Sequence, residues 1–279
     1  MALSIHTNYS SLVTQTNLGK TNNALGTNQQ RLGTGLRINS AADDAAGLQI
    51  ATRLNAQSRG MDVAMRNTGD SISLLQTAEG AFSEMTDIMQ RMKDLATQAA
   101  NDTNSDDDRA SLKAEYDELG NELTNIISNT KYAGEALFAA GGKLTAAMTF
   151  QIGSSSAETL SFNASANLTA VTGAITTIKA ETLDTAANAG GAMDELETAL
   201  DAVGTLRSQL GANINRLNHT ANNLANMKDN TDMAKGRIMD ADFAKESANM
   251  TKNSMLMQSG ISMLKQAGQM PGMVMSLLG

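Results

Sequence analysis

Residues 57–99 read QSRGMDVAMRNTGDSISLLQTAEGAFSEMTDIMQRMKDLATQA, and this stretch decides the fold. Apolar or small residues recur at every seventh position, and a second set follows three places behind the first. The first set is Met61, Thr68, Leu75, Phe82, Met89 and Ala96, and the second is Ala64, Ser71, Ala78, Met85, Met92 and Ala99. A heptad repeat of this length predicts one helix, roughly 60 Å long, whose seam packs on partner helices.

Two further stretches supply those partners. Residues of about 176–230 carry a second heptad seam, which Arg207 interrupts. Its two sets are Leu196, Val203, Leu210, Leu217 and Leu224, and Met193, Leu200, Ile214 and Ala221. A shorter helix is predicted at about 105–129, with Ser105 or Asp106 as its N-cap. Its apolar residues Leu112, Tyr116, Leu119, Leu123 and Ile126 stand three or four places apart, so it should fold back along the first helix.

Between about 131 and 175 the sequence is rich in Gly, Ser and Thr, and apolar residues alternate at Met148, Phe150 and Ile152 and again at Leu160 and Phe162. Alternation of this kind predicts short strands in one or two hairpins. We therefore predict a mainly α protein, in which long antiparallel heptad-patterned helices form a rod domain at 41–235 with a small β-hairpin region.

Both ends of the chain are predicted to be amphipathic helices, at 4–32 and about 243–277. Each presents a single apolar stripe, and a lone stripe buries too little surface to hold a helix in water. We expect residues 1–40 and 236–279 to pair as a terminal two-helix coiled-coil domain and to contact neighbouring copies, although an ordinary intramolecular core is the alternative. The predicted self-assembly residues are Ile5, Leu12, Leu18, Leu25, Leu32, Phe243, Met250, Met257 and Leu264.

Composition excludes several classes of partner. The chain has 279 residues and a net charge of −8, which disfavours nucleic acid as a partner. No apolar stretch reaches the roughly 20 residues that a membrane span needs. The N-terminal sequence lacks the charged-then-apolar plan of a cleavable signal peptide, so export would need another route. Only 3% of residues are aromatic, while 18 Met and many Ala and Leu carry the apolar surface, which favours helix seams.

No catalytic, cofactor or metal site is predicted. His6 and His219 lie in unrelated contexts, there is no Cys, and the HExxH and GxSxG motifs are absent. The Gly-rich stretch 33–47 lacks the ending of a phosphate-binding loop. The acidic pair Asp43 and Asp44 and the run Asp106–Asp108 could supply oxygen ligands to a cation, but hydrogen bonds or ion pairs in a connector and a helix cap explain them better. The chain is therefore predicted not to be an enzyme.

Three segments resemble the bacterial flagellins. RLGTGLRINSAADDAAGLQIATRL (Arg31–Leu54) is similar to the signature of their N-terminal region. LRSQLGANINRLNHTANNLANM (Leu206–Met227) resembles their C-terminal rod helix, and Gly236–Gly279 resembles their terminal helix down to the SLL ending. The resemblance is in the right order and covers nearly all of the helical sequence.

This resemblance implies a secreted, extracellular subunit that polymerises into the helical flagellar filament for motility. It implies export in an unfolded state through the flagellar type III apparatus with a chaperone, and contact with hook-associated and cap proteins. Only about 45 residues lie between the predicted rod helices, so outer domains should be absent or vestigial and a peptidase insert has no room. This compact centre hints at a lateral rather than a polar filament.

The resemblance also implies a patch recognised by Toll-like receptor 5. The segment QRMKDLATQ matches that patch through Arg91, Leu95 and Gln98, with Glu115 as the acid on the next helix. Lys93, Asp94 and Thr97 depart from it, and the simpler interpretation is that Arg91 and Glu115 serve subunit contacts. Hydroxyl-linked sugars are considered at Ser154, Ser155 and Ser156, because that region should be exposed.

Two other functions remain open at this point. A hook-filament junction protein shares similar ends but forms a short ring, and a secreted coiled-coil binding protein would use the same helices to recognise another molecule. Filament growth from the purified chain would separate them.

Overall fold

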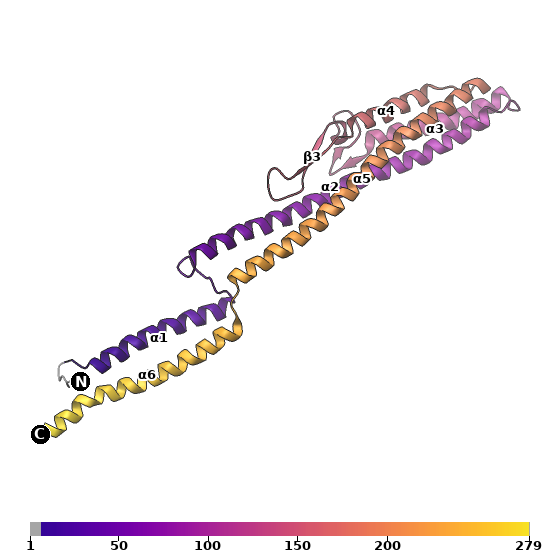
Figure 1. Cartoon of the computed structure of the whole chain (residues 1–279). Coiled ribbons are helices and arrows are strands. Elements are labelled where there is room, and N and C mark those ends of the chain that lie inside the picture. Colours follow the sequence, from indigo (N-terminus) through magenta and orange to yellow (C-terminus); the bar gives the residue numbers. More distant parts are fainter. Residues whose placement is uncertain (1–6, 279) are drawn as a thin grey trace. The chain divides into compact units, whose positions relative to one another are not determined.

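The computed structural model describes residues 7–278, within which six α-helices carry most of the chain (Figure 1). The helices are α1 (Tyr9–Thr34), α2 (Ala45–Ala99), α3 (Asp106–Asn129), α4 (Ser165–Ala180), α5 (Ala186–Met239) and α6 (Phe243–Leu278). The strands are β1 (Lys131–Tyr132), β2 (Glu135–Ala136), β3 (Met148–Gln151) and β4 (Thr159–Phe162), and a short 3-10 helix, η1, spans Lys143–Thr145. The fold is mainly α, as predicted.

The described residues divide into two units. The bundle unit comprises residues 58–229, and the terminal unit comprises the described residues up to Gln57 together with those from Asn230 onward. The predicted borders were at 40/41 and 235/236. Each unit has its own internal packing.

The bundle unit is built around the heptad seams that the sequence predicts. Every member of both seam sets in α2 between Met61 and Ala99 is buried. The leucine and valine set of α5 is buried as well, and most of its second set packs partly buried against the same core. In α3, Tyr116 and Leu123 are buried while Leu112, Leu119 and Ile126 are partly buried. The predicted apolar face of this helix therefore packs against the core of the bundle unit.

Ion pairs between α2 and α5 show that the two helices run antiparallel within the bundle unit. The Lys228 Nζ to Asp62 Oδ1 distance is 3.5 Å, the Arg207 to Glu79 distance is 2.8 Å, and Lys93 approaches Glu197 at 3.1 Å. As the residue number rises on one helix it falls on the other. Arg207, which interrupts the predicted seam, is therefore accommodated by a carboxylate at the edge of the core rather than inside it.

The connection from α2 to α3 is closed by side chains. Ser105 caps α3 and forms a capping box with Asp108, as one of the two predicted caps. The buried Arg109 donates from Nε to the Ala99 carbonyl at 2.9 Å and from Nη2 to the Asn101 carbonyl at 3.1 Å. The bond to Ala99 satisfies a carbonyl group that the end of α2 leaves without a helical partner, and the bond to Asn101 holds the loop that follows.

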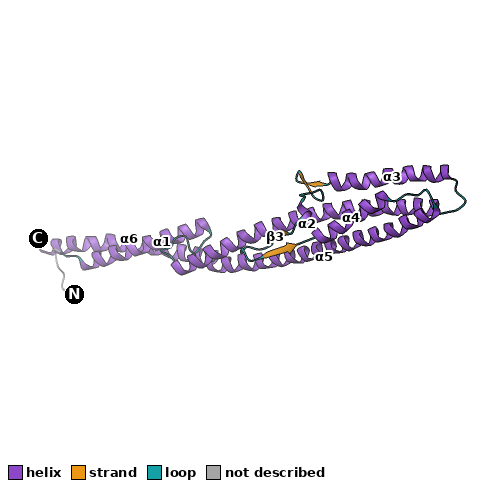
Figure 2. Ribbon diagram, turned by 90° about the horizontal axis from the view of Figure 1, so that it is seen from above, coloured by secondary structure: helices purple, strands orange, loops and turns teal. Residues whose placement is uncertain are grey.

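Two hairpins follow α3, in the region where strands were predicted (Figure 2). In β1–β2 the two turn residues have positive φ, 52° at Ala133 and 85° at Gly134, which suits a two-residue hairpin turn. In β3–β4, Met148 pairs with Phe162 and Phe150 with Leu160, which places the alternating apolar side chains on one face.

Several helix boundaries differ from the prediction, and α5 continues to Met239, beyond the predicted end at about 230. Residues 165–175, assigned to the hairpin region, belong to α4, because Leu168, Val171, Ile175 and Ile178 form a buried helical face that the surrounding Thr and Gly conceal in the sequence. Residues 181–185 separate α4 from α5, so the predicted helix of 176–230 is broken. The helix predicted from 57 begins at Ala45, where Asp44 Oδ1 accepts the Gly47 N–H at 2.8 Å.

The terminal unit contains α1 and α6, which lie side by side and run in opposite directions (Figures 1 and 2). Asn8 contacts Ala267 at one end of the pair, and Asn28 contacts Glu246 near the other.

Within the described residues, no helix combines the length and the apolar character that a membrane span requires.

Candidate functional site

The α1–α6 contact follows a heptad pattern, but half of its seam is polar or small. The side chains that face the partner helix stand alternately three and four residues apart, and all are buried or half-buried. On α1 they are Ser11, Thr14, Leu18, Thr21, Leu25, Asn28 and Leu32, and on α6 they are Glu246, Met250, Asn253, Met257, Gly260, Leu264 and Ala267. Such a seam buries little apolar surface per turn, so its packing stabilises the pair only weakly.

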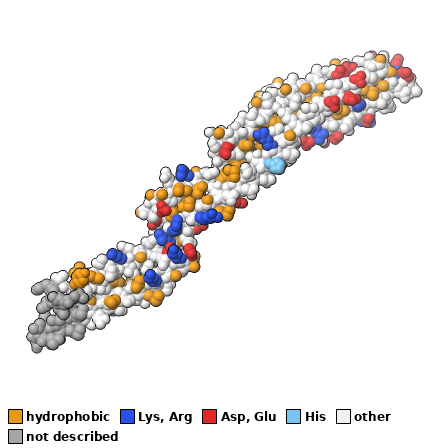
Figure 3. All heavy atoms as spheres, in the orientation of Figure 1, with side chains coloured by type: hydrophobic (Ala, Val, Ile, Leu, Met, Phe, Trp, Pro, Cys, Tyr) orange, Lys and Arg blue, Asp and Glu red, His pale blue; other side chains and the backbone are white. Residues whose placement is uncertain are grey.

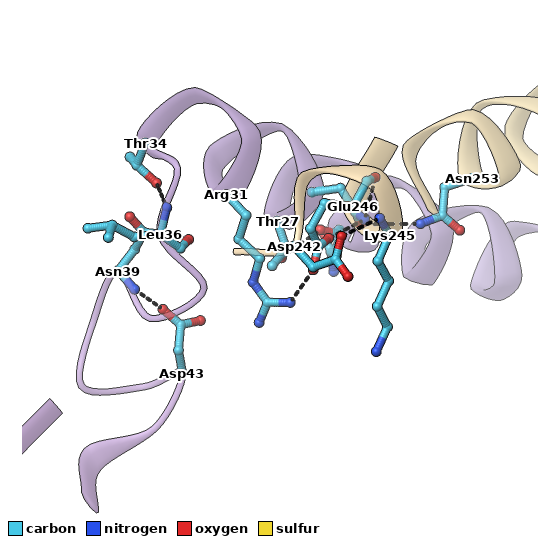
Figure 4. A network of polar contacts seen from close by, with 12 residues as sticks. Thr27, Arg31, Thr34, Leu36, Asn39, Asp43, Asp242, Lys245, Glu246 and Asn253 are labelled. Atoms are coloured by element: carbon cyan, nitrogen blue, oxygen red, sulfur yellow. Dashed lines mark hydrogen bonds and ion pairs between the residues drawn. The ribbon is translucent and has the colours of Figure 1, made fainter. Parts of the chain in front are cut away.

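A polar network occupies one end of this seam, where α1 ends and α6 begins (Figure 4). The buried Glu246 carboxylate accepts from Asn28 Nδ2 at 2.8 Å and from Arg31 Nη1 at 3.2 Å. Asn253 Nδ2 lies 3.4 Å from Asn28 Oδ1 and extends the network along α6. Arg31 Nε is buried without a hydrogen-bond partner among the described residues. Because buried polar groups are costly when unpaired, this network favours the one alignment of α1 and α6 that pairs them.

Both ends of the α1–α6 pair are tied by further contacts. Asn8 caps α1 by accepting the Ser11 N–H, and its Nδ2 donates to the Ala267 carbonyl at 2.7 Å. A Cβ on Gly260 would lie 2.7 Å from Leu18 Cδ2, so glycine there lets α1 approach closely. Beyond α1, Leu36 and Asp240 form an antiparallel bridge, with the Arg37 N–H donating to the Met239 carbonyl at 2.6 Å.

The connector between α1 and α2 uses an aspartate to close a turn (Figure 4). Asp43 Oδ2 accepts the backbone N–H groups of Asn39 at 3.1 Å and of Ser40 at 2.9 Å. These hydrogen bonds, with one from the Ser40 hydroxyl, hold the pKa of Asp43 below its usual value. Asp43 therefore serves the connector, and within the described residues no cluster of three or more His, Cys, Asp or Glu could hold a metal ion.

The predicted self-assembly residues fall into two groups. Leu18, Leu25, Leu32, Met250, Met257 and Leu264 are half-buried in the α1–α6 seam. Leu12 and Phe243 instead keep 54% and 63% of their surface exposed. Ile5 lies outside the described residues. Apolar side chains also dot the surface of this unit in Figure 3.

The residues of the predicted receptor patch are not all at the surface. The exposed Arg91 and Glu115 form an ion pair at 2.7 Å, and Gln98 is exposed. Leu95 is only 1% exposed and packs in the bundle core, so its side chain is not available to a receptor. It was predicted as an apolar contact, but it lies beside the Met92 and Ala96 seam and points inward with them. Ser154, Ser155 and Ser156 are exposed.

Comparisons with known proteins agree with this architecture. Residues 5–143 match the family model described as the bacterial flagellin N-terminal helical region, and residues 193–278 match the bacterial flagellin C-terminal helical region. The chain belongs to the bacterial flagellin family. A flagellin of Halalkalibacterium halodurans is 41% identical over 250 residues, which cover 89% of this chain and 90% of that protein.

Longer flagellins align along the whole chain. Flagellin A of Vibrio anguillarum is 34% identical over 381 aligned positions that cover all of both proteins, against the 279 residues of this chain, so it carries residues that this flagellin lacks. The crystal structure of Bacillus cereus flagellin is 33% identical with a TM-score of 0.50, and the match covers 57% of this chain and 88% of that one. This flagellin is a structural subunit of the extracellular flagellar filament and not an enzyme.

Sequence reasoning missed the polar half of the terminal seam. The predicted stripe on α6 followed Phe243, Met250, Met257 and Leu264, while the second set, three places behind, is Glu246, Asn253, Gly260 and Ala267. The heptad spacing includes these four positions. An amphipathic stripe is recognised by its apolar residues, however, and a buried Glu is not apolar. Its partner Asn28 likewise stands three places after Leu25.

Proposed function

We propose that α1 and α6 are the assembly element of this flagellin. They are disordered in the isolated monomer, pair with each other in the filament, and have their remaining apolar side chains covered by neighbouring copies. Folding of the ends and addition of a subunit are then a single coupled step.

The observation that carries this proposal is the thin α1–α6 seam. Within the described part of the two helices, the buried side chains are those of Asn28, Glu246 and Ala267, and the other seam residues are half-buried. A two-helix pair with so little buried apolar surface does not offset the conformational entropy of ordering about 60 residues. Contacts from other molecules must supply the difference.

The exposed apolar side chains support neighbouring copies as the source of those contacts. Tyr9, Leu12 and Val13 on α1 and Phe243, Met255, Leu256, Ile261 and Met263 on α6 are exposed. Burying a large apolar side chain that is half exposed contributes about 1 kcal/mol, so eight such residues in each copy supply several kcal/mol to assembly. A homopolymer places the same face of each copy against another copy and uses this surface repeatedly.

A truncation tests the proposal. Removing residues 240–279 should leave thermal unfolding of the bundle unit unchanged but abolish elongation of filament seeds, as observed by electron microscopy. The substitution Phe243→Asp is a smaller companion change at an exposed position, and it should slow elongation without altering unfolding. Hydrogen–deuterium exchange on the full-length monomer should be fast in α1 and α6 and slow at 58–229.

The same experiment addresses the other functions. A truncated chain that still elongates, or terminal helices already protected in the monomer, would contradict the coupled-assembly proposal. Capped rings from the intact chain would favour a hook-filament junction protein, and a species that stays soluble would favour a secreted binding protein. Long filaments are the expected outcome.

Export and capping partners follow from the same assignment. A chain whose ends are disordered before assembly can pass in an unfolded state through the flagellar type III export apparatus, with a chaperone covering the apolar α6 side chains. Hook-associated and cap proteins would present complementary surfaces at the two ends of the filament. Loss of secretion on deleting the N-terminal segment, with the bundle unit intact, is the expected result.

A second proposal concerns Toll-like receptor 5. Arg91, paired with Glu115 of α3, supplies a charged contact, and Gln98, two turns further along α2, supplies a polar one, which suits the rim of a binding site. The double substitution Arg91→Ala and Gln98→Ala should lower receptor signalling by soluble monomer more than it lowers secretion. Lys143→Ala, which breaks an exposed ion pair with Glu135, is the matched control and should leave signalling unchanged. A wild-type monomer that fails to stimulate the receptor would contradict this assignment.

A further inference from the structure

The methionines of this flagellin are concentrated in the last helix and differ sharply in exposure. Seven of the 18 Met lie in α6. In the bundle unit Met85, Met89 and Met92 are fully buried, whereas Met255 and Met263 on α6 keep 59% and 61% of their surface exposed. The sequence has no Cys, so methionine provides all of its sulfur.

Met255 and Met263 share one side of α6 with Leu256. With about 100° of rotation per residue, the three side chains fall within a single arc of roughly 100°. The seam residues Glu246, Met250, Asn253 and Met257 occupy the opposite side, where they contact α1. The two thioethers therefore stand with Leu256 on a face that points away from the intramolecular partner and that also carries Lys252 and Ser259.

We propose that Met255 and Met263 form an oxidation-sensitive modification site, whose conversion to methionine sulfoxide blocks addition of this flagellin to a filament. The inference rests on the proposed function, in which the outer face of α6 is covered by neighbouring copies. It adds that the oxidation state of the Met255 and Met263 sulfur atoms decides whether a neighbouring copy can cover that face.

The reaction needs only a peroxide as oxidant. A sulfur lone pair attacks one oxygen of hydrogen peroxide, the O–O bond breaks, and water leaves as the sulfur becomes a sulfoxide. The sulfur loses two electrons and the peroxide gains them. A methionine sulfoxide reductase reverses the step with two thiols, which become a disulfide as water is released.

The consequence follows from the change in polarity. A thioether is apolar and adaptable, whereas a sulfoxide carries a strong hydrogen-bond acceptor. On an exposed face the sulfoxide is solvated and harmless to the monomer. When a neighbouring copy covers it, that oxygen loses water without gaining a partner, so assembly is penalised while the bundle unit is unaffected.

Exposure predicts the order of reaction. Met255 and Met263 should oxidise before the buried methionines of the bundle unit, because peroxide must reach the sulfur. Met233 on α5 is also exposed, at 54%, and provides a matched methionine outside α6. The sites are distinguished by peptide mass spectrometry, since each sulfoxide adds one oxygen atom.

The test compares three forms of the full chain: wild type, Met255→Leu with Met263→Leu, and Met233→Leu. Each is treated as monomer with a limited amount of hydrogen peroxide, freed of oxidant, and added to filament seeds. Treated wild type and treated Met233→Leu should elongate about tenfold more slowly than untreated wild type, because sulfoxides stand on the assembly face. Because α6 is disordered in the monomer, Met250 and Met257 are oxidised as well, so the treated double variant should elongate more slowly than its untreated form but clearly faster than treated wild type. Methionine sulfoxide reductase should restore the wild type.

Two outcomes would overturn the inference. Treated wild type that carries sulfoxide at both positions and still elongates normally would show that the face tolerates the modification. A treated double variant that is as impaired as wild type would place the sensitive methionines elsewhere. Failure of the proposed assembly role is distinguishable, because the chain lacking 240–279 would then elongate as untreated wild type does.

Discussion

The bundle unit and the α1–α6 pair use the same heptad spacing with different side chains. In α2 from Met61 to Ala99 the seam positions hold Leu, Met, Phe and Ala, with Thr68 and Ser71 as the two polar exceptions, and all are buried. In α1 and α6 half of the equivalent positions hold Ser, Thr, Asn, Glu or Gly, and most remain half-buried. Spacing decides which side of a helix faces its partner, whereas the residues on that side decide whether the contact is stable without help.

The largest difference between the two regions should appear when each loses an apolar residue. Leu210 is fully buried in the bundle core, and Leu210→Asp replaces it with a carboxylate that has no partner. We expect a loss of about 3–5 kcal/mol in the free energy of unfolding, from lost packing and from desolvation of the acid. Denaturant unfolding followed by circular dichroism measures it.

The matched change in the other region is Leu12→Asp. This residue is exposed, so the unfolding midpoint of the monomer should not move, while seed elongation should slow. An unchanged midpoint for Leu210→Asp would place that residue on the surface and contradict the core of the bundle unit.

A substitution in the polar network of Glu246, Asn28 and Arg31 should have an intermediate effect on the stability of the filament. Arg31→Ala leaves the buried Glu246 carboxylate without its charged partner, although the bond from Asn28 remains. Loss of one partner of a buried polar group costs about 1–3 kcal/mol, which should lower the temperature at which filaments depolymerise. Lys245→Ala, an exposed cation one residue from Glu246, is the control and should leave that temperature unchanged. Equal effects of the two changes would mean that net charge, and not the network, stabilises the pair.

The smallest effect is expected at the α3 cap. Ser105→Ala removes the hydroxyl that accepts the Asp108 N–H, and loss of such a cap costs about 1 kcal/mol in unfolding of the bundle unit. The Ser105 hydroxyl and N–H also hold the pKa of Asp108 below its usual value. The contribution of this carboxylate is therefore present above the pKa of an unfolded Asp and is lost as the pH falls through the lowered value in the fold.

Ser105→Ala should consequently flatten the dependence of stability on pH in the acid range as well as lower stability at neutral pH. Unfolding measured from pH 7 down to pH 2 tests both. Thr103→Ala, in the same loop but outside the capping box, should keep the wild-type dependence.

Much of this flagellin could be predicted from sequence wherever the pattern was both periodic and apolar. The α2 seam from Met61 to Ala99 and the α5 seam from Leu196 to Leu224 are buried as the spacing requires. The β3–β4 hairpin follows from alternation at Met148, Phe150, Leu160 and Phe162. Residues 165–175 of α4 escaped prediction as a helix because Thr and Gly fill its exposed side and weaken the contrast on which periodicity depends.

The sequence by itself determined the family, the heptad spacing and the weakness of the terminal stripes, because these depend on local order along the chain. Only the tertiary structure decided that Leu95 faces the core, that Glu246 is buried while Phe243 stays exposed, and that Asn28 and Arg31 are the partners of Glu246. A heptad fixes which positions can share a face. The pairing of Glu246 with Asn28 joins residues 218 positions apart in the chain, and such pairing depends on how two helices align and which buried polar groups satisfy one another.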